Sequence, residues 1–200
     1  MKYFFSLIFF IFFITENAQA DEAADWLKTE IDFILNAYEN KGTSDKEKFL
    51  MIENTINDNF AGAGIAKFVS GNAWLKADKK TKKKYIELFK RHLALTIASM
   101  MQGYSKQTYK LINSKYDKKN KVSLIDMEIY TDTGSLLVTW RVKQSKKRFY
   151  VIDLIVADIS LVVTKRDEFN SLLKNVDYNL KEFNILLKNQ NEESYNKVIN

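Results

Sequence analysis

Apolar side chains in the first half of the chain recur every three or four residues, the spacing of one face of an α-helix. This pattern predicts helices at about residues 26–40, 45–60 and 79–102. Ser44 and Glu47 have the spacing of a capping box at the start of the second helix, and Asp78 precedes the third. The apolar positions of the third helix are Tyr85, Leu88, Phe89, Leu93, Ile97, Met100 and Met101.

The second half begins with alternating apolar and polar residues, which predicts β-strands. Four strands are expected at about residues 109–116, 122–129, 136–142 and 149–156, joined by short polar turns. Short turns favour antiparallel pairing. Two helical patterns follow, at about 160–174 and 178–189. The order of elements predicts an α+β fold in which helices pack on a curved, four-stranded antiparallel sheet.

The last predicted strand is apolar on both faces, whereas an antiparallel sheet usually has one solvated face. Alternation places Phe149, Val151, Asp153 and Ile155 on one face and Tyr150, Ile152, Leu154 and Val156 on the other. Either helices cover both faces, or one face lines an apolar cavity. The pattern alone leaves both interpretations open.

The N-terminus has the features of a secretory signal peptide. Lys2 precedes an apolar run from Tyr3 to Ile14, and a small-x-small cleavage site follows at residues 18–20. The run is short for a membrane span, and Glu16 and Asn17 interrupt it, which favours cleavage over an uncleaved anchor. We therefore expect a signal peptide at 1–20 and a single mature domain at 21–200.

The amino-acid composition favours one cellular compartment and certain classes of binding partner. The chain has no cysteine, so an exported protein of this length must rely on its hydrophobic core, which suits the periplasm of a Gram-negative bacterium. The net charge of +6 favours anionic membrane surfaces or acidic partners. Lysines cluster at 79–84 and 143–148, either as plain solvated surface or as a basic rim. Nucleic acid is not an expected partner, because no binding motif is present.

Catalytic motifs are absent from the sequence: it has one histidine, no cysteine, and no metalloprotease, serine-hydrolase or phosphate-loop pattern. We expect no metal site, no cofactor and no enzymatic activity. Asp153 requires a partner if it is buried, and Arg141 on the neighbouring strand predicts a structural ion pair. The alternative is a hydrolase or isomerase in which Asp153 and Arg141, joined by Asp126 and Glu128, activate water inside a cavity.

The segment from residue 140 to residue 169 resembles the MlaC family of periplasmic phospholipid-binding, or toluene-tolerance auxiliary, proteins. The positions that carry the resemblance are Trp140, Arg141, Tyr150, Asp153, Ser160, Leu161, Arg166 and Phe169, with Gly71, Trp74, Tyr85 and Phe89 upstream and the leucine pattern 180–187 downstream. Two positions depart from the family pattern: Trp140 replaces the usual tyrosine and Asp158 the usual glycine. Asp tolerates a left-handed backbone better than most residues, so the turn at Asp158 is expected to survive.

The resemblance implies a fold similar to nuclear transport factor 2, with helices and sheet around a deep apolar cavity. It implies a non-enzymatic carrier of phospholipids that maintains the lipid asymmetry of the outer membrane. The implied partners are an inner-membrane ABC transporter with its substrate-binding ring and an outer-membrane lipoprotein–porin complex. Hopanoid-type lipids are an alternative cargo.

A lipid carrier needs an apolar cavity, because each CH₂ group exposed to water costs about 0.8 kcal/mol. Methionine suits a wall that must adapt to variable acyl chains. The expected wall residues are Phe89, Leu93, Ile97, Met100, Met101, Val138, Trp140, Tyr150, Ile152, Leu154 and Val156, each of which has ordinary core packing as its alternative. On this assignment, Ile152→Glu is predicted to abolish lipid retention.

Overall fold

The computed structural model describes residues 15–104 and 106–200, with side chains from residue 21 onward, Ser105 excepted. Most of the predicted signal peptide therefore lies outside the described residues, and residues 15–20 form the first turns of α1. Among the described helices, none combines the length and the hydrophobicity that a membrane crossing requires.

Seven helices and five strands make up the described fold, which confirms the α+β prediction. The helices are α1 (Thr15–Glu39), α2 (Asp45–Asn59), α3 (Gly62–Ser70), α4 (Asn72–Lys76), α5 (Lys79–Met101), α6 (Leu161–Lys174) and α7 (Leu180–Ile199). The strands are β1 (Thr108–Asp117), β2 (Val122–Thr131), β3 (Gly134–Ser145), β4 (Arg148–Val156) and β5 (Ile159–Ser160). They form one antiparallel sheet in the order β1-β2-β3-β4-β5. The prediction of four strands is corrected to five, because the two residues of β5 are too few to show alternation.

The predicted helix starts are confirmed by their caps. Ser44 Oγ accepts a hydrogen bond from the backbone N–H of Glu47, and the Glu47 carboxylate accepts from the backbone N–H of Ser44. Asp78 caps α5 by accepting from the N–H of Thr81 at 2.8 Å. Ala157 and Asp158 have φ values of +46° and +65° in the turn between β4 and β5, so Asp158 adopts the left-handed backbone expected of it.

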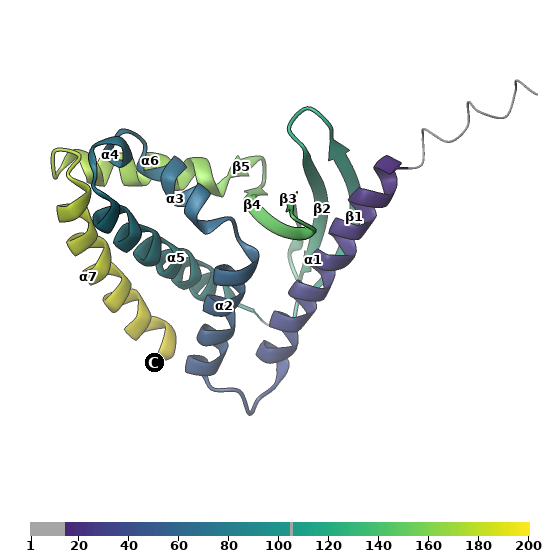
Figure 1. The fold of residues 1–200 in the computed structure, drawn as a ribbon. Helices are drawn as coiled ribbons and strands as arrows, with labels where there is room; N and C mark the ends of the chain where they lie inside the picture. The colour runs from purple at the N-terminus through teal and green to yellow at the C-terminus, as the bar shows by residue number, and fades with distance from the viewer. Residues whose placement is uncertain (1–14, 105) are drawn as a thin grey trace, which may run out of the picture.

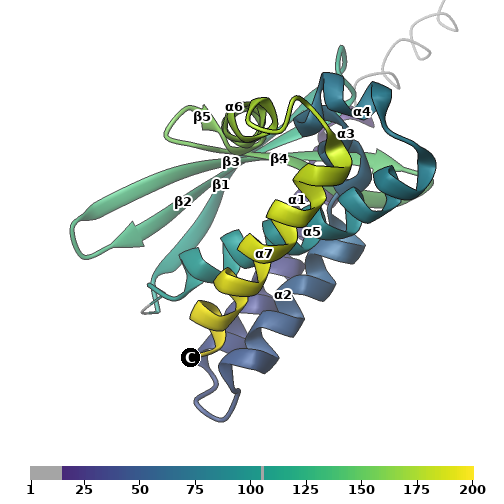
Figure 2. The same ribbon diagram turned by 90° about the vertical axis from the view of Figure 1, so that its left-hand side faces the viewer.

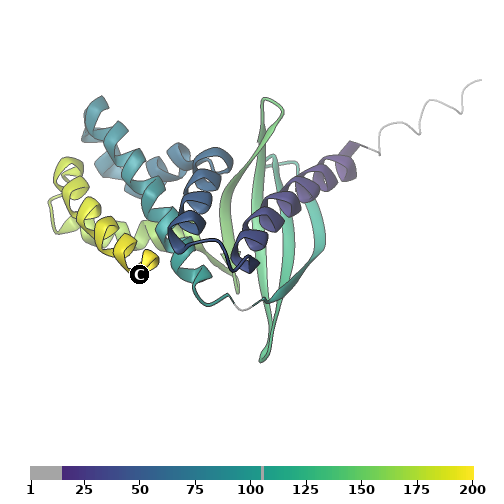
Figure 3. The same ribbon diagram turned by 90° about the horizontal axis from the view of Figure 1, so that it is seen from below.

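The sheet and the helical group lie side by side, and α1 crosses one face of the sheet (Figures 1 and 3). Helices α2, α5 and α7 run next to one another on the far side from β1 (Figures 1 and 2). The centre of the helical group is a cluster of aromatic rings from α5, α6 and α7, with centroids 5.2–6.2 Å apart: Tyr85, Phe89, Phe169 and Phe183. This packed core lies apart from the sheet face that α1 covers.

An irregularity in β4 decides which of its side chains share a face. Leu154 pairs with Trp140, but Val151 pairs with Val142, so β4 has one more residue than β3 over this stretch. The extra residue is a β-bulge, which interrupts the strict alternation of side chains. Val151 and Leu154 therefore lie on one face, and Ile152 and Asp153 lie on the other. We call the face of Val151 and Leu154 the cavity face.

Candidate functional site

A cavity of about 410 Å³ lies between the cavity face of the sheet, α1, the C-terminal half of α2 and the C-terminal end of α5. The helices contribute Trp26, Leu27, Glu30, Ile31, Ile34, Leu35, Ile52, Thr55, Ile56, Asn59, Ile97, Met100, Met101 and Leu161. The strands contribute Tyr109, Met127, Ile129, Thr131, Leu136, Val138, Trp140, Val151, Leu154 and Val156, and connecting segments add Phe60, Gly103, Tyr104 and Gln107. The size falls in the range of small-molecule and lipid sites.

The wall is apolar but is not packed shut. Ile31, Ile34, Trp140 and Leu154 lie between the sheet and its covering helices, yet each is only partly buried. Side chains in a closed core at such positions would be fully buried. The partial exposure therefore comes from the void they face, and it separates this region from the aromatic core of the helical group.

Seven of the expected wall residues line the cavity: Ile97, Met100, Met101, Val138, Trp140, Leu154 and Val156. Phe89 and Leu93 do not, and their placement is corrected. Both are buried in the helical core, and Phe89 packs against Tyr85 and Phe169. The stripe along α5 is continuous in sequence, but only its last turns extend past the helical group to the sheet.

Tyr150 and Ile152 are also corrected, because the bulge in β4 places them on the opposite face of the sheet. The ring of Tyr150 lies under the guanidinium group of Arg148 at 5.4 Å from its centroid. Ile152 lines a separate, smaller hollow. A strictly alternating strand would have put both side chains beside Leu154, and a single sequence gives no signal for the bulge.

The wall contributed by α1 and β2 was not assigned from the sequence. Ile31, Ile34 and Leu35 of α1 line the cavity, as do Met127 and Ile129 of β2. The sequence predicts a helix and a strand that contain these residues. The missing information was which tertiary partner each face meets, and neither periodicity nor composition supplies it.

Polar contacts attach the C-terminal part of α1 to the start of the sheet. Tyr109 Oη donates to Asp32 Oδ1 at 2.6 Å, and Tyr104 Oη donates to Glu39 Oε1 at 2.9 Å. Burial, reinforced by the hydrogen bond to Glu39, raises the pKa of Tyr104 to about 12, and burial with the hydrogen bond to Asp32 raises the pKa of Tyr109. Both tyrosines therefore keep their donating protons at neutral pH. Nearer the N-terminal end of α1, the ring of Trp26 lies 5.7 Å from that of Phe149.

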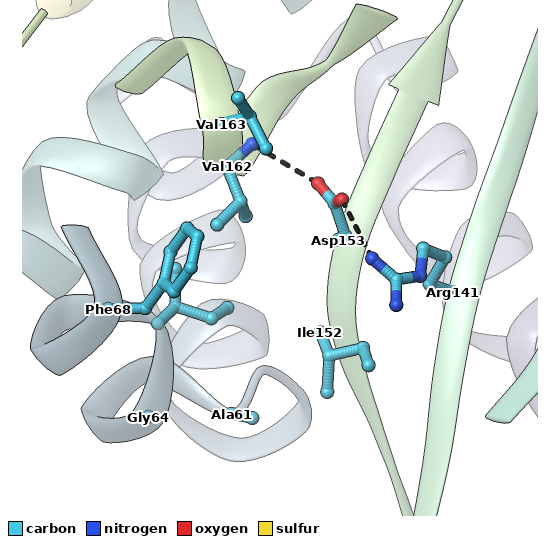
Figure 4. Close-up of a pocket in the computed structure, with 9 residues that line it drawn as sticks. Ala61, Gly64, Phe68, Arg141, Ile152, Asp153, Val162 and Val163 are labelled. Atoms are coloured by element: carbon cyan, nitrogen blue, oxygen red, sulfur yellow. Dashed lines mark hydrogen bonds and ion pairs between the residues drawn. The ribbon is translucent and has the colours of Figure 1, made fainter. Parts of the chain in front are cut away.

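The smaller hollow, of about 260 Å³, lies on the opposite face between β3, β4, α3 and α6 (Figure 4). Arg141 and Asp153 meet at its edge, with Nη1 of Arg141 3.3 Å from Oδ2 of Asp153. The Asp153 side chain is only 3% exposed. Its Oδ2 also accepts from Ser160 Oγ at 2.7 Å, and its Oδ1 accepts from the N–H of Val162 at 3.1 Å. Asp153 thus ties β4 to β3 and to the start of α6.

The other two carboxylates of the alternative catalytic hypothesis, Asp126 and Glu128, do not join this pair. Asp126 accepts from Thr139 at 2.6 Å and from Asn113 at 3.1 Å, and Glu128 accepts from Tyr130 and Ser135. Neither lines the hollow or the cavity. Over the part of the chain that the structure describes, no three metal-ligating side chains are grouped together.

The two basic clusters occupy different places. The lysines at 79–84 lie at the N-terminal end of α5, whereas the cavity meets the C-terminal end of this 23-residue helix. They are therefore far from the cavity, at about 1.5 Å of helix per residue. The second cluster forms the turn between β3 and β4, next to Phe149 and hence to Trp26 at the cavity wall.

The family model and the structural comparison identify the same kind of protein. The model of a family described as MlaC protein matches residues 28–184. Among solved structures, the fold is similar to a phospholipid-binding protein from Ralstonia solanacearum, whose structure was determined in complex with a phospholipid. The TM-score is 0.73 at 15% sequence identity, and the match covers 88% of this chain and 98% of the other. No curated protein was found to match the chain.

Proposed function

The chain belongs to the MlaC family, and from this premise we propose that it carries a phospholipid in the cavity beneath α1. The observation that supports the proposal most directly is the apolar cavity of about 410 Å³, which is bounded by partly exposed aliphatic and aromatic side chains. The structurally similar protein from Ralstonia solanacearum holds a phospholipid, which suggests the class of cargo.

The physical task of a carrier is to replace the bilayer interior during transit. Two acyl tails of roughly 15 carbons each would cost on the order of 20 kcal/mol if they were bare in water. A wall of leucine, isoleucine, valine, methionine and aromatic side chains removes most of that cost. Met100 and Met101 at the end of α5 provide adaptable surface for chains of different length.

The wider setting is part of the same proposal. We expect export through a cleaved signal at residues 1–20, a mature domain at 21–200 and a location in the periplasm. There the protein would move lipid between an outer-membrane lipoprotein–porin complex and an inner-membrane ABC transporter with its substrate-binding ring. A likeness to the nuclear transport factor 2 fold is also proposed. Hopanoid-type lipids are an alternative cargo that mass spectrometry of the bound lipid would distinguish.

A binding role without catalysis is favoured by the saturation of Asp153. A carboxylate that activates water needs an oxygen free to accept a proton. Three donors already contact the two oxygens of Asp153, and Arg141 and Asp153 lie across the sheet from the cavity. The geometry therefore supports a structural ion pair rather than a hydrolase or isomerase centre.

The β-bulge supplies a matched pair of variants for the test. Leu154→Glu places a charge on the cavity wall, whereas Ile152→Glu places the same charge two positions away on the opposite face. Protein purified without detergent would be examined by native mass spectrometry and lipid extraction. We expect the unmodified protein and Ile152→Glu to carry lipid and Leu154→Glu to be empty. Absence of lipid from the folded, unmodified protein, together with no uptake from vesicles, would contradict the carrier proposal.

A further inference from the structure

The charge distribution along the cavity wall is uneven. Among the described residues that line the cavity, Glu30 is the one with a formal charge, and these residues include neither lysine nor arginine. Glu30 lies on the inner side of α1, one turn after Trp26, and it is partly buried. Any charged part of a ligand at this position therefore meets a carboxylate and no cation.

Glu30 has no ion-pair partner among the described residues. At the C-terminal end of α2, Asn59 and Asp58 act on the Glu30 carboxylate, and Asp58 adds a second negative charge. Burial raises the pKa of Glu30 above its usual value, and Asp58 adds to the effect, while Asn59 opposes it. A carboxylate that is partly desolvated and unpaired gains stability from a cationic ligand.

A positive group lies close by, but outside the cavity. Arg148, at the start of β4, donates from Nη2 to the backbone carbonyl of Asp58 at 3.2 Å. Its neighbour Phe149 packs on Trp26, which lines the wall. The guanidinium group of Arg148 also lies over the ring of Tyr150, on the face of the sheet opposite the cavity, so it does not offset the negative charge of Glu30 inside the cavity. The cavity lining therefore favours a headgroup with an ammonium group over one with a net negative charge.

We propose that Glu30 selects phospholipids with an amine-bearing, zwitterionic headgroup over anionic phospholipids by pairing with the ammonium group. This inference rests on the proposed carrier function and specifies its substrate class. An anionic headgroup would bring a net negative charge to a wall that holds only a carboxylate. A phosphoethanolamine headgroup brings an ammonium to Glu30 and adds no net charge to the wall.

The test is a competition between two lipids. Delipidated protein would be incubated with vesicles of equal phosphatidylethanolamine and phosphatidylglycerol content, separated from them, and its bound lipids quantified by mass spectrometry. We expect about threefold to fivefold enrichment of phosphatidylethanolamine over the vesicle ratio, the size that a partly solvated ion pair gives. Glu30→Gln is expected to move the ratio back to that of the vesicles, and Glu30→Lys to favour phosphatidylglycerol.

The control is Asp25→Asn, which removes the same charge from an exposed position of α1 outside the cavity lining. It should keep the ratio of the unmodified protein. Lipid bound at the vesicle ratio, or a ratio unchanged by Glu30→Gln, would overturn the headgroup assignment while leaving the carrier proposal intact. Failure of the unmodified protein to bind either lipid would overturn both. Total lipid per protein and the lipid ratio therefore report on the two proposals separately.

Discussion

Asp153 shows how a single side chain can be forced by its neighbours into a structural role. It is almost completely buried, and its donors come from β3, from the turn at β5 and from the first turn of α6. A buried carboxylate is tolerated only when its charge and its lone pairs are satisfied. The burial and the partner Arg141 could be predicted from the sequence. The contacts with Ser160 and Val162 could not, because they depend on where α6 begins.

A double-mutant cycle on Arg141 and Asp153 should measure this coupling. Arg141→Met leaves a buried charge without its cation, and Asp153→Asn removes the charge that Arg141 balances. Each is expected to lower the free energy of unfolding by about 2 kcal/mol, and the double variant by at least 1 kcal/mol less than the sum. Urea denaturation provides the measurement.

The control for this cycle is the exposed pair Lys188–Glu192 on α7, whose side chains are 60% and 64% exposed. Its coupling energy should be no more than about 0.5 kcal/mol. Equal coupling in the two cycles would contradict the role assigned to Asp153. Loss of bound lipid from folded Asp153→Asn would show that the opposite face of the sheet also contributes to cargo binding.

His92 gives a prediction about acid stability. It lies in the helical core against Phe169, its Nδ1 is 3.3 Å from Asn191 Oδ1, and Lys165 and Glu168 of α6 are the charges that act on it. Burial lowers the pKa of His92 to about 4, and Lys165 contributes. Because the unfolded chain takes up the proton near pH 6.5 and the folded chain does not, stability is lost as the pH falls from about 6.5 toward 4.

The corresponding experiment compares the unmodified protein with His92→Gln at pH 7.5 and pH 5.0. The difference in unfolding free energy between the two proteins should change by about 2 kcal/mol, with the unmodified protein losing more on acidification. Carboxylates titrate in both proteins and cancel in the difference. Parallel pH profiles for the two proteins would show that His92 is protonated as readily in the folded state as in the unfolded chain.

At the scale of helices and strands, hydrophobic periodicity was sufficient to predict most of the fold, but it was insufficient to predict which residues line the cavity. The helix caps and the four longer strands follow from local sequence. Local sequence does not determine which face of a strand points to the cavity. In β4, one extra residue at Ile152 reverses the orientation of Tyr150 and Ile152 relative to Leu154. Likewise, the apolar stripe of α5 is uniform, and only tertiary packing divides it into core at Phe89 and cavity wall at Ile97.

The attachment of α1 to the sheet is a second feature at the level of helices and strands. Its C-terminal part is tied to the sheet side through the two tyrosine–carboxylate hydrogen bonds. Replacing both tyrosines, with Tyr104→Phe and Tyr109→Phe, should accelerate amide hydrogen exchange at residues 32–39 about thirtyfold, since each of the two bonds to a charged group contributes on the order of 1 kcal/mol. Bound lipid should also dissociate faster.

Tyr130→Phe is the matched control for that variant. Tyr130 Oη also donates to a carboxylate, at 2.7 Å from Glu128 Oε2, but both residues belong to β2 and alternate with Met127 and Ile129 of the cavity face, so this pair lies on the opposite face of the sheet. It should leave exchange in α1 unchanged. Similar exchange in the control and the double variant would mean that apolar packing alone holds α1 over the cavity.

For the whole molecule, the stability of the fold and its capacity for cargo oppose each other. The helical group holds a dense aromatic core, whereas the region between α1 and the sheet leaves apolar side chains partly exposed to a void. A void forfeits packing energy that the same residues would gain in a closed core. Cargo that fills it should therefore stabilise the folded state by mass action, and the proposed carrier role would explain why the void is kept.

Filling the void with a side chain should raise the unfolding temperature and reduce the amount of bound lipid. Val156→Phe adds an aromatic ring on the cavity wall at the end of β4, and Ile155→Phe adds the same ring on the opposite face of the strand. We expect Val156→Phe to raise the unfolding temperature of the delipidated protein by about 3 °C, which corresponds to about 1 kcal/mol in a domain of this size, and to halve its bound lipid or more. Ile155→Phe should leave lipid content unchanged. Full lipid loading of Val156→Phe would mean that the tails bind elsewhere, because a ring in the cavity and two acyl chains compete for the same limited volume.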